Sequence, residues 1–375
     1  MSRRIRALLL ILAVGSVYGC IARGSPPLVK IGLVAPFEGD YRPLGYDALN
    51  GVRMAVRERN AEGGGLGRRV EVVALDDHGE PSEARRQAAE LALDPLIFGA
   101  IGHLRDETTA AAATVYSQAG LALVTLGAPS LVSVPSVDGQ ARLGPAEDEI
   151  FDVMLHHAVA LDVRRAAVVS GSETLLDLAI APAGLELVPF PGPHALLSSG
   201  FEGDGVWDAV LFLGSDEDGA GLLVALREAG WNGAFLGGPA LESPVFAGWA
   251  GPFAANVFYF SGSYRVSEPD FDALHRELAG SGPGPWAGAA YDAARLLLDG
   301  LEEAIQQNGA LSREGVVQAL VGAELDGITG GTALNGRGAG SGAPVTIYRF
   351  TGSYPGTPLA ASDIGSAVES RWAES

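Results

Sequence analysis

Short apolar runs alternate with helical patterns along this chain, and this alternation constrains its fold more than any other feature. Runs rich in β-branched residues and separated by amphipathic stretches are typical of parallel sheets with crossover helices. The pattern therefore predicts an α/β protein with strands at residues 30–35, 70–75, 97–101, 122–125, 166–169, 209–213, 234–236, 257–260 and 345–350.

Helical periodicity is clearest at residues 47–61, 82–93 and 287–307. In the first of these segments Leu49, Val52 and Val56 share one face, and a run of glycines ends the helix. At 375 residues the chain exceeds the limit of about 250 to 300 residues for a single core. Because the strand–helix pattern restarts after Gly144, we expect a second lobe of similar design.

Charge and cysteine content exclude several classes of function. The formal net charge is −20, and such a surface repels nucleic acid and anionic lipid. Lys30 is the only lysine. Cys20 is the only cysteine, so the chain cannot build a disulfide framework or a thiolate metal site by itself. We expect no cofactor and no metal.

The first twenty residues have the form of an export signal. Arg3, Arg4 and Arg6 precede an apolar run at residues 7–14, which is too short to span a bilayer core of about 30 Å. The following Val-Tyr-Gly-Cys20 resembles the bacterial lipobox, whose cysteine is acylated. We therefore expect a lipoprotein signal peptide at residues 1–19 and a tether at 20–28, with an ordinary signal peptide and an incidental cysteine as the alternative.

Enzyme motifs are absent from the sequence. It contains no G-x-S-x-G, H-E-x-x-H or G-x-x-x-x-G-K-[ST] pattern. The runs Asp76-Asp77-His78 and His156-His157 are poor metal sites, because adjacent residues on a strand point to opposite faces. A hydrolase is accordingly the less favoured reading.

A series of segments resembles, in order, the extracellular Leu/Ile/Val-binding protein family, the type I periplasmic solute-binding proteins of branched-chain amino acid ABC transporters. The segments are KIGLVAPFEG (30–39), NAEGG (60–64), VEVVALDD (70–77), IGHL (101–104), TLGAP (125–129), RLGPAE (142–147), ALREAG (225–230) and AYDAA (290–294). No single segment is diagnostic, but their order over residues 29–350 is specific.

This resemblance implies two doubly wound lobes joined by three crossovers, near residues 142–145, 261–264 and 326–330. Lobe 1 would comprise residues 29–142 and 264–327, and lobe 2 residues 143–263 and 328–350. Residues 351–375 would form a C-terminal tail. The ligand would lie between the lobes, at the carboxyl ends of the strands.

An amino-acid-like ligand carries a carboxylate and an ammonium, and both need partners once water leaves the cleft. Helix N-termini offer free N–H groups to the carboxylate, which favours the turn with Asp106 and Thr108 and the loop with Gly127, Ala128 and Ser130. The resemblance places an acid, Glu147, near the ammonium.

Further candidates follow from the strand ends. Arg105 could bind a carboxylate and Asp106 an ammonium or a polyol, although a solvated charge at a helix start explains Asp106 equally well and Arg105 better. Ser215 and Asp216 follow a predicted strand, with an acidic helix cap as the alternative. Aromatic walls could come from Tyr46 and, against a stronger expectation of core packing, from Phe37, Tyr41 and Trp286.

The sequence also departs from the family. Arg105-Asp106 stands where the family commonly has a ligand-binding serine, and residues 170–177 lack the tyrosine that the family places over its ligand. Residues 237–240, Gly-Gly-Pro-Ala, replace a segment that carries a glutamate for the ammonium. The ligand is therefore not expected to be recognised just as leucine is.

The sequence predicts an extracytoplasmic, lipid-anchored solute-binding protein without catalytic activity. It would capture an amino acid or a related amide or carboxylate and close over it by hinge motion. A membrane-bound ABC transporter permease would be its partner. A ligand-sensing receptor domain of the same fold is the alternative, because the clamp would be identical.

Overall fold

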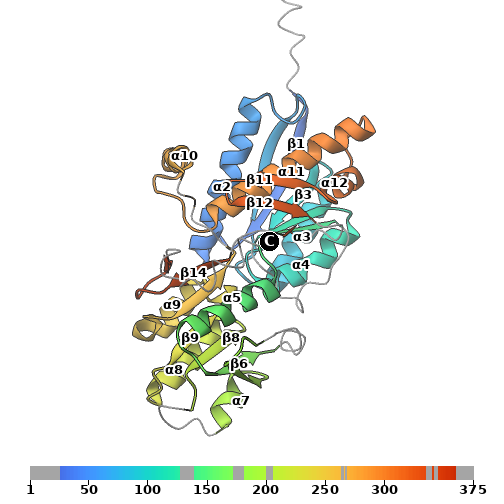
Figure 1. The fold of residues 1–375 in the computed structure, drawn as a ribbon. Helices are drawn as coiled ribbons and strands as arrows, with labels where there is room; N and C mark the ends of the chain where they lie inside the picture. Colours follow the sequence, from blue (N-terminus) through green and yellow to red (C-terminus); the bar gives the residue numbers. More distant parts are fainter. Residues whose placement is uncertain are drawn as a thin grey trace, which may run out of the picture.

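The computed structural model describes residues 26–126, 139–171, 181–199, 206–262, 266, 268–334, 340–341 and 345–359. These residues form two lobes, one above the other in Figure 1, and each lobe is a sheet with helices on both faces. None of the helices in these ranges is long and apolar enough to cross a membrane.

The first lobe contains a five-stranded parallel sheet in the order β2-β1-β3-β4-β5. Its strands are β1 (Leu28–Ala35), β2 (Arg69–Asp76), β3 (Ile97–Gly102), β4 (Ala122–Leu126) and β5 (Gln140–Leu143). One face is covered by α2 (Arg42–Ala61) and α11 (Ala287–Asn308), with α10 (Pro269–Ala279) and α12 (Arg313–Leu320) alongside. The other face is covered by α3 (Pro81–Leu93) and α4 (Asp106–Gln118).

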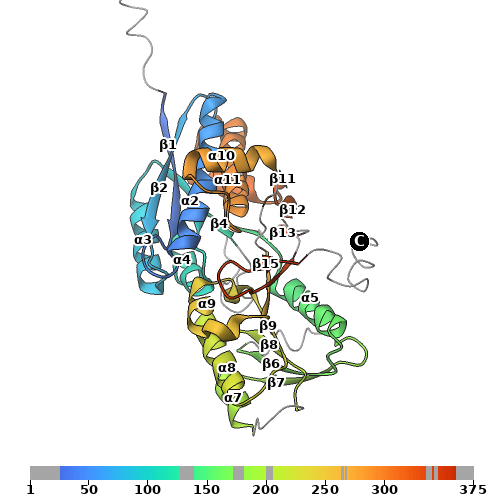
Figure 2. The ribbon, with the colours of Figure 1, turned by 90° about the vertical axis from the view of Figure 1, so that its left-hand side faces the viewer.

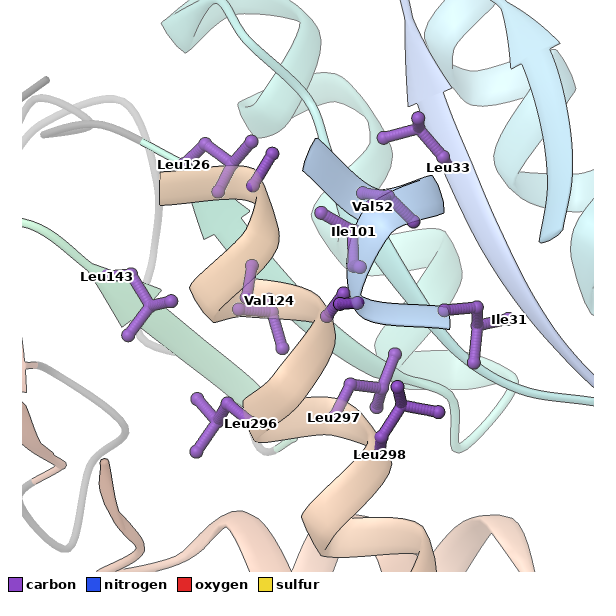
Figure 3. Packing of buried hydrophobic residues seen from close by; sticks show 14 of the residues in the cluster. Ile31, Leu33, Val52, Ile101, Val124, Leu126, Leu143, Leu296, Leu297 and Leu298 are labelled. Carbon is purple, nitrogen blue, oxygen red and sulfur yellow. The ribbon is translucent and has the colours of Figure 1, made fainter. Parts of the chain in front are cut away.

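The core of this lobe lies between the sheet and α11. Figure 3 shows branched side chains of the strands, among them Ile31, Ile101 and Val124, meeting Leu297 of α11. Helices α2 and α11 approach closely because Gly51 faces α11, where a Cβ would lie 2.1 Å from the carbonyl oxygen of Ala287.

The second lobe contains a seven-stranded sheet in the order β15-β14-β10-β9-β8-β6-β7. Its strands are β6 (Arg165–Ser170), β7 (Glu186–Phe190), β8 (Ala209–Leu213), β9 (Ala234–Gly237), β10 (Phe258–Ser261), β14 (Thr346–Arg349) and β15 (Thr357–Pro358). Helix α5 (Glu147–Ala160) covers one face, and α8 (Asp216–Glu228) and α9 (Pro244–Ala250) cover the other. Helix α7 (Pro193–Ser198) packs at the outer end.

The two lobes repeat one design. Strands β7-β6-β8-β9-β10 are parallel and have the same spatial order, 2-1-3-4-5, as the five strands of the first lobe. This is a common doubly wound order, in which ligands bind outside the carboxyl ends of the strands. The predicted α/β fold with two doubly wound lobes is confirmed.

The last part of the chain differs from the expected lobe boundaries. Strands β11 (Glu324–Gly327), β12 (Gly330–Leu334) and β13 (Gly340–Ser341) form a small antiparallel sheet, and Leu325 and Leu334 belong to the first lobe's core. The chain therefore returns to the second lobe between residues 341 and 345, later than the expected 326–330.

Residues 351–359 are not part of a detached tail. Strand β15 pairs with β14 in the second lobe's sheet, and Figure 2 shows it near the junction of the two lobes. The hydroxyl of Tyr259 accepts a hydrogen bond of 3.1 Å from the backbone N–H of Gly356. Pairing with an otherwise open sheet edge explains why this segment folds back.

Candidate functional site

A cavity of about 340 Å³ lies between the lobes at the carboxyl ends of their strands. Both lobes and the first crossover contribute to its wall. The lining residues are Tyr41, Leu44, Leu104, Arg105, Asp106, Glu107, Leu126, Glu147, Ser170, Gly171, Leu213, Gly214, Ser215, Asp216, Gly238, Pro239, Ala240, Glu242, Ser243 and Trp286.

The first lobe presents a stacked cation to this cavity. Arg105 stands immediately before α4, and its guanidinium lies 4.0 Å from the ring centre of Tyr41, which precedes α2. Its Nε lies 3.6 Å from Glu107 Oε2, which is an ion pair but too long for a hydrogen bond. Within the described residues Nε and Nη1 have no hydrogen-bond acceptor. The cation is thus held by stacking and charge, with hydrogen-bonding capacity unused.

The second lobe presents carboxylates that its own hydroxyl groups hold. Asp216, at the start of α8, is buried and accepts a hydrogen bond of 2.5 Å from Ser243 Oγ. Ser243 also caps α9, where it accepts from the N–H of Val245 at 3.0 Å. Glu242 is buried as well, and Ser261 Oγ donates to it at 2.5 Å. These acids are therefore fixed in place before any ligand arrives.

Asp216 joins the two lobes directly. The Tyr41 hydroxyl donates to Asp216 Oδ2 at 2.9 Å, and Arg105 Nη1 lies 3.5 Å from Asp216 Oδ1. Two of the crossovers between the lobes also touch, because a Cβ on Gly262 would lie 2.3 Å from Pro145 Cδ. A change in the angle between the lobes must therefore break or remake the contacts of Asp216.

Trp286 reaches the cavity because a buried carboxylate fixes the start of α11. Asp47 of α2 accepts hydrogen bonds from the N–H groups of Gly284, Trp286 and Ala287 at 2.7, 2.7 and 3.0 Å. Burial raises the pKa of Asp47, and these three donors oppose that rise. The result is a rigid junction between α2 and α11 behind the cavity wall.

The structure brings together part of the predicted site. Arg105, Asp106, Glu147, Ser215 and Asp216 all line the cavity, Glu147 at the first turn of α5 and Ser215 as the N-cap of α8. Gly127, Ala128 and Ser130 lie outside the described residues, as does Cys20.

Tyr46 and Thr108 are not among the described residues that line this cavity. Tyr46 is five residues beyond Tyr41, which turns it by about 140° around the helix. Its ring is 40% exposed, with Phe37 at 5.6 Å on one side. Thr108 is buried and uses its hydroxyl within the turn, donating to the carbonyl oxygen of Arg105 at 2.9 Å.

Several lining residues were missed or underrated by sequence reasoning. Ser170 ends β6, and Glu242 and Ser243 follow the short 3₁₀ helix η1 (Pro239–Leu241). Residues 237–240 lack the glutamate that the family uses for the ammonium, but Glu242, two residues later, is buried and lines the cavity. Tyr41 and Trp286 line the cavity, although core packing was favoured for both. The usable signal was the position at or after the end of a strand for Ser170, Glu242 and Ser243, and the position just before a helix for Tyr41 and Trp286.

The described residues contain no cluster of three or more metal-ligating side chains. Asp77, considered with His78 as a ligand, instead bonds His103 Nδ1 at 2.6 Å inside the first lobe. The donors and acceptors at the cavity are hydroxyl, guanidinium and carboxylate groups, which suit a small polar molecule.

Comparison with known families identifies the family of this chain. Residues 28–175 and 205–353 match the family described as periplasmic binding protein. This chain belongs to the periplasmic binding protein family. The resemblance to the Leu/Ile/Val-binding proteins that the sequence segments suggested is confirmed, and the chain is a solute-binding protein.

Relatives of this periplasmic binding protein are distant. A Leu/Ile/Val-binding protein of Rhizobium johnstonii is 25% identical over 310 residues, covering 78% of this chain and 83% of that protein. An amino acid binding protein of Pseudomonas aeruginosa is 29% identical over 168 residues, covering 44% and 45%. The crystal structure of a leucine-binding protein from Thermotoga maritima superposes with a TM-score of 0.69 at 20% identity, covering 88% and 98%, which shows the shared fold.

Proposed function

We propose that this periplasmic binding protein captures a small amino-acid-like ligand outside the cytoplasm and delivers it to an ABC importer. The observation that carries the proposal is the cavity between the lobes, which is lined by the cation Arg105 of the first lobe and by acids of both lobes and of the first crossover. The two ends of a zwitterion would each find a group of opposite charge there.

Arg105 is the group that we assign to the ligand's carboxylate. A guanidinium donates charge-assisted hydrogen bonds to a carboxylate, and Nε and Nη1 of Arg105 have no acceptor among the described residues. Stacking on Tyr41 fixes the plane of the guanidinium, so little side-chain entropy is lost on binding.

Glu147 and Glu242 are the groups that we assign to the ligand's ammonium. Both are buried at the wall of the cavity, one at the crossover and one in the second lobe. Because the partners of the two ends lie on different parts of the chain, a bound ligand would hold the lobes together. Closure of the hinge over the ligand follows from that arrangement.

Delivery to a membrane partner requires the protein to stay near the membrane. The lipobox-like Val-Tyr-Gly-Cys20 supports acylation of Cys20 after export. A similar solved structure, an ABC transporter substrate-binding protein of Desulfitobacterium hafniense in complex with leucine, supports an ABC transporter as the partner. Several acyl chains anchor stably, because each buried methylene contributes about 0.8 kcal/mol.

A thermal-shift screen tests the proposal. The soluble form that lacks residues 1–20 is heated with amino acids, amides, small carboxylates and polyols, since a ligand that binds only the folded state raises the melting temperature. We expect at least one amino-acid-like compound to do so. No shift with any amino-acid-like compound, or catalytic conversion of one, would contradict the proposal.

Calorimetry on the best ligand then tests the assignment of Glu147. Glu147→Gln should weaken binding of a ligand with an ammonium by about 1 to 3 kcal/mol, the usual cost of losing a charged hydrogen-bond partner. Glu90→Gln, on the exposed face of α3, serves as the matched control. Unchanged affinity in the Glu147 variant would remove this residue from the site.

A further inference from the structure

The outer end of the first lobe exposes three leucines around the start of β1, one at the end of α3 and two on loops. Leu93 is 84% exposed, Leu66 48% and Leu96 38%. We call this surface the leucine pole. Figure 1 shows that β1, around whose start these residues lie, begins at the end of the molecule away from the second lobe.

Backbone pairing places these loops beside the first described residues of the chain. The N–H of Lys30 donates to the carbonyl oxygen of Leu96 at 2.8 Å, and the N–H of Arg69 donates to that of Pro27 at 2.9 Å. Leu66 lies in the turn immediately before β2, whose first residue pairs with Leu28. Neighbouring strands are about 4.8 Å apart, so all three leucines surround the point where the chain enters the lobe.

The chain from the end of α3 to Leu96 is fixed by hydrogen bonds to Arg313. The Arg313 guanidinium donates to the carbonyl oxygens of Ala92, Asp94 and Ile97 at 3.1, 2.8 and 3.0 Å. The Asp94 carboxylate pairs with Lys30 Nζ at 2.8 Å. The polar atoms of this loop thus face the protein, and its leucines face outward on a fixed backbone.

The distance from Cys20 to the leucine pole is short. Five residues separate Cys20 from Pro26, so these two Cα atoms can be at most about 22 Å apart, at roughly 3.6 Å per residue. This step rests on the proposed function, because it requires Cys20 to be acylated. An acylated Cys20 would keep the start of β1 within that distance of the lipid headgroups.

Local charge removes the repulsion that the rest of the protein would meet at a membrane. The whole chain has a net charge of −20. The segments 26–30, 62–69 and 93–96 instead carry Lys30, Arg68 and Arg69 against Glu62 and Asp94, one more base than acid. The leucine pole itself therefore lacks the excess of acid that would repel anionic lipid headgroups.

We propose that the leucine pole rests on the lipid surface that holds the acylated Cys20, with Leu93 at the boundary between headgroups and acyl chains. The short tether brings the pole to the lipid, and the exposed leucines bury their side chains there. The anchor and the pole together fix the orientation of the first lobe, and leave the second lobe to move above the membrane.

A quenching experiment on the acylated full-length protein tests this contact. Leu93→Cys is labelled with the fluorophore NBD, which is specific because the acylated Cys20 leaves no other thiol. The protein is reconstituted into phosphatidylcholine vesicles that contain doxyl-labelled lipid. Leu197→Cys on α7, a leucine 39% exposed in the second lobe, is the matched control. Leu66→Cys repeats the measurement from the neighbouring loop.

We expect the doxyl lipid to quench the label at residues 93 and 66 and to leave the label at 197 bright. Equal quenching at 93 and 197 in protein that floats with the vesicles would overturn the proposal. Quenching of the label at residue 93 only when a permease is reconstituted as well would also overturn it. Failure of the protein to float with the vesicles would do the same, because it would show that Cys20 does not anchor the protein. Ligand binding is measured on the soluble form, so these results leave the proposed capture of a ligand to its own test.

Discussion

The two lobes share one sheet order but hold their buried histidines in opposite ways. In the first lobe His103 bonds Asp77 at 2.6 Å and lies 3.3 Å from the Tyr116 hydroxyl. In the second lobe His157 packs between the rings of Phe258 and Phe260, and neither ring nitrogen has a hydrogen-bond partner among the described residues. Equal topology therefore does not imply equal interiors: the first lobe depends on a polar network and the second on aromatic packing.

The surfaces of the two lobes that face the cavity also differ, in the charge that they present. The first lobe offers a cation whose hydrogen-bonding capacity is unused, whereas the second offers carboxylates already bonded to serines. The carboxylate of a zwitterionic ligand would accept hydrogen bonds from the cation of the first lobe, and its ammonium would face the carboxylates of the second. Four substitutions test how far this contrast between the lobes extends.

The largest effect is expected from removing the acid of the first lobe's network. Asp77→Ala leaves His103 buried without its partner, and breaking a buried pair in this way costs about 3 to 5 kcal/mol. Urea unfolding at neutral pH measures the loss. Asp326→Ala, an exposed aspartate of β11, should change the free energy of unfolding by less than about 0.5 kcal/mol. A loss below about 1 kcal/mol for Asp77→Ala would mean that the network does not support the lobe.

The second lobe should lose stability in acid because of His157. Burial lowers the pKa of this histidine to about 4, so the unfolded state, with a pKa of about 6.5, binds the proton more tightly. Stability is therefore greatest above about pH 6.5 and falls as the pH drops toward 4, by an amount on the order of 3 kcal/mol. His157→Leu should flatten this dependence in unfolding measured between pH 7 and 5, whereas His194→Gln, on an exposed helix, should not. An unchanged slope in the Leu variant would show that His157 is not the cause.

The charge contrast at the cavity predicts a selective loss of affinity. Arg105→Met should weaken binding of a carboxylate ligand by about 2 kcal/mol, because a hydrogen bond to a charged group is lost. The corresponding amide, which has no carboxylate, should lose much less. Arg85→Met on the exposed face of α3 is the control. Equal losses for acid and amide in calorimetry would show that Arg105 does not bind the ligand's carboxylate.

The smallest effect is expected for the contact that joins the lobes. Tyr41→Phe removes the hydrogen bond to Asp216 and should shift the ligand-free protein toward more open forms by about 1 kcal/mol. Small-angle scattering would report this as a larger radius of gyration. Tyr46→Phe, in α2 just after Tyr41 but outside the cavity, should have no effect. The same radius in both variants would show that this bond does not restrain the lobes.

Most of the first lobe and of the parallel core of the second could be predicted from the sequence, because most strands there are compact apolar runs. Strand β5, with the sequence QARL, is not such a run and was missed. The exception in the second lobe is β7, which contains Pro189. A proline inside a run argues against a central strand, since it cannot donate a ladder hydrogen bond. It is tolerated because β7 is the edge strand of the sheet. Edge position is a property of the assembled sheet and cannot be read from the run itself.

The site was predictable where a residue directly follows a strand or begins a helix, as Arg105, Glu147 and Asp216 do. It was not predictable where tertiary packing turns a side chain. Tyr41 enters the cavity and Tyr46 does not, because α2 begins at Arg42, earlier than the periodicity indicated. Ser243 faces Asp216 only because η1 folds the chain back after β9.

Tyr354 affects how a shortened version of this protein should be designed. Its ring is partly buried against the first lobe's core and, at the same time, against the core of the second. A boundary drawn after Phe350, which the sequence alone would recommend for expression, would delete an aromatic side chain from two hydrophobic cores at once. Residues up to 359 should therefore be retained in any such version.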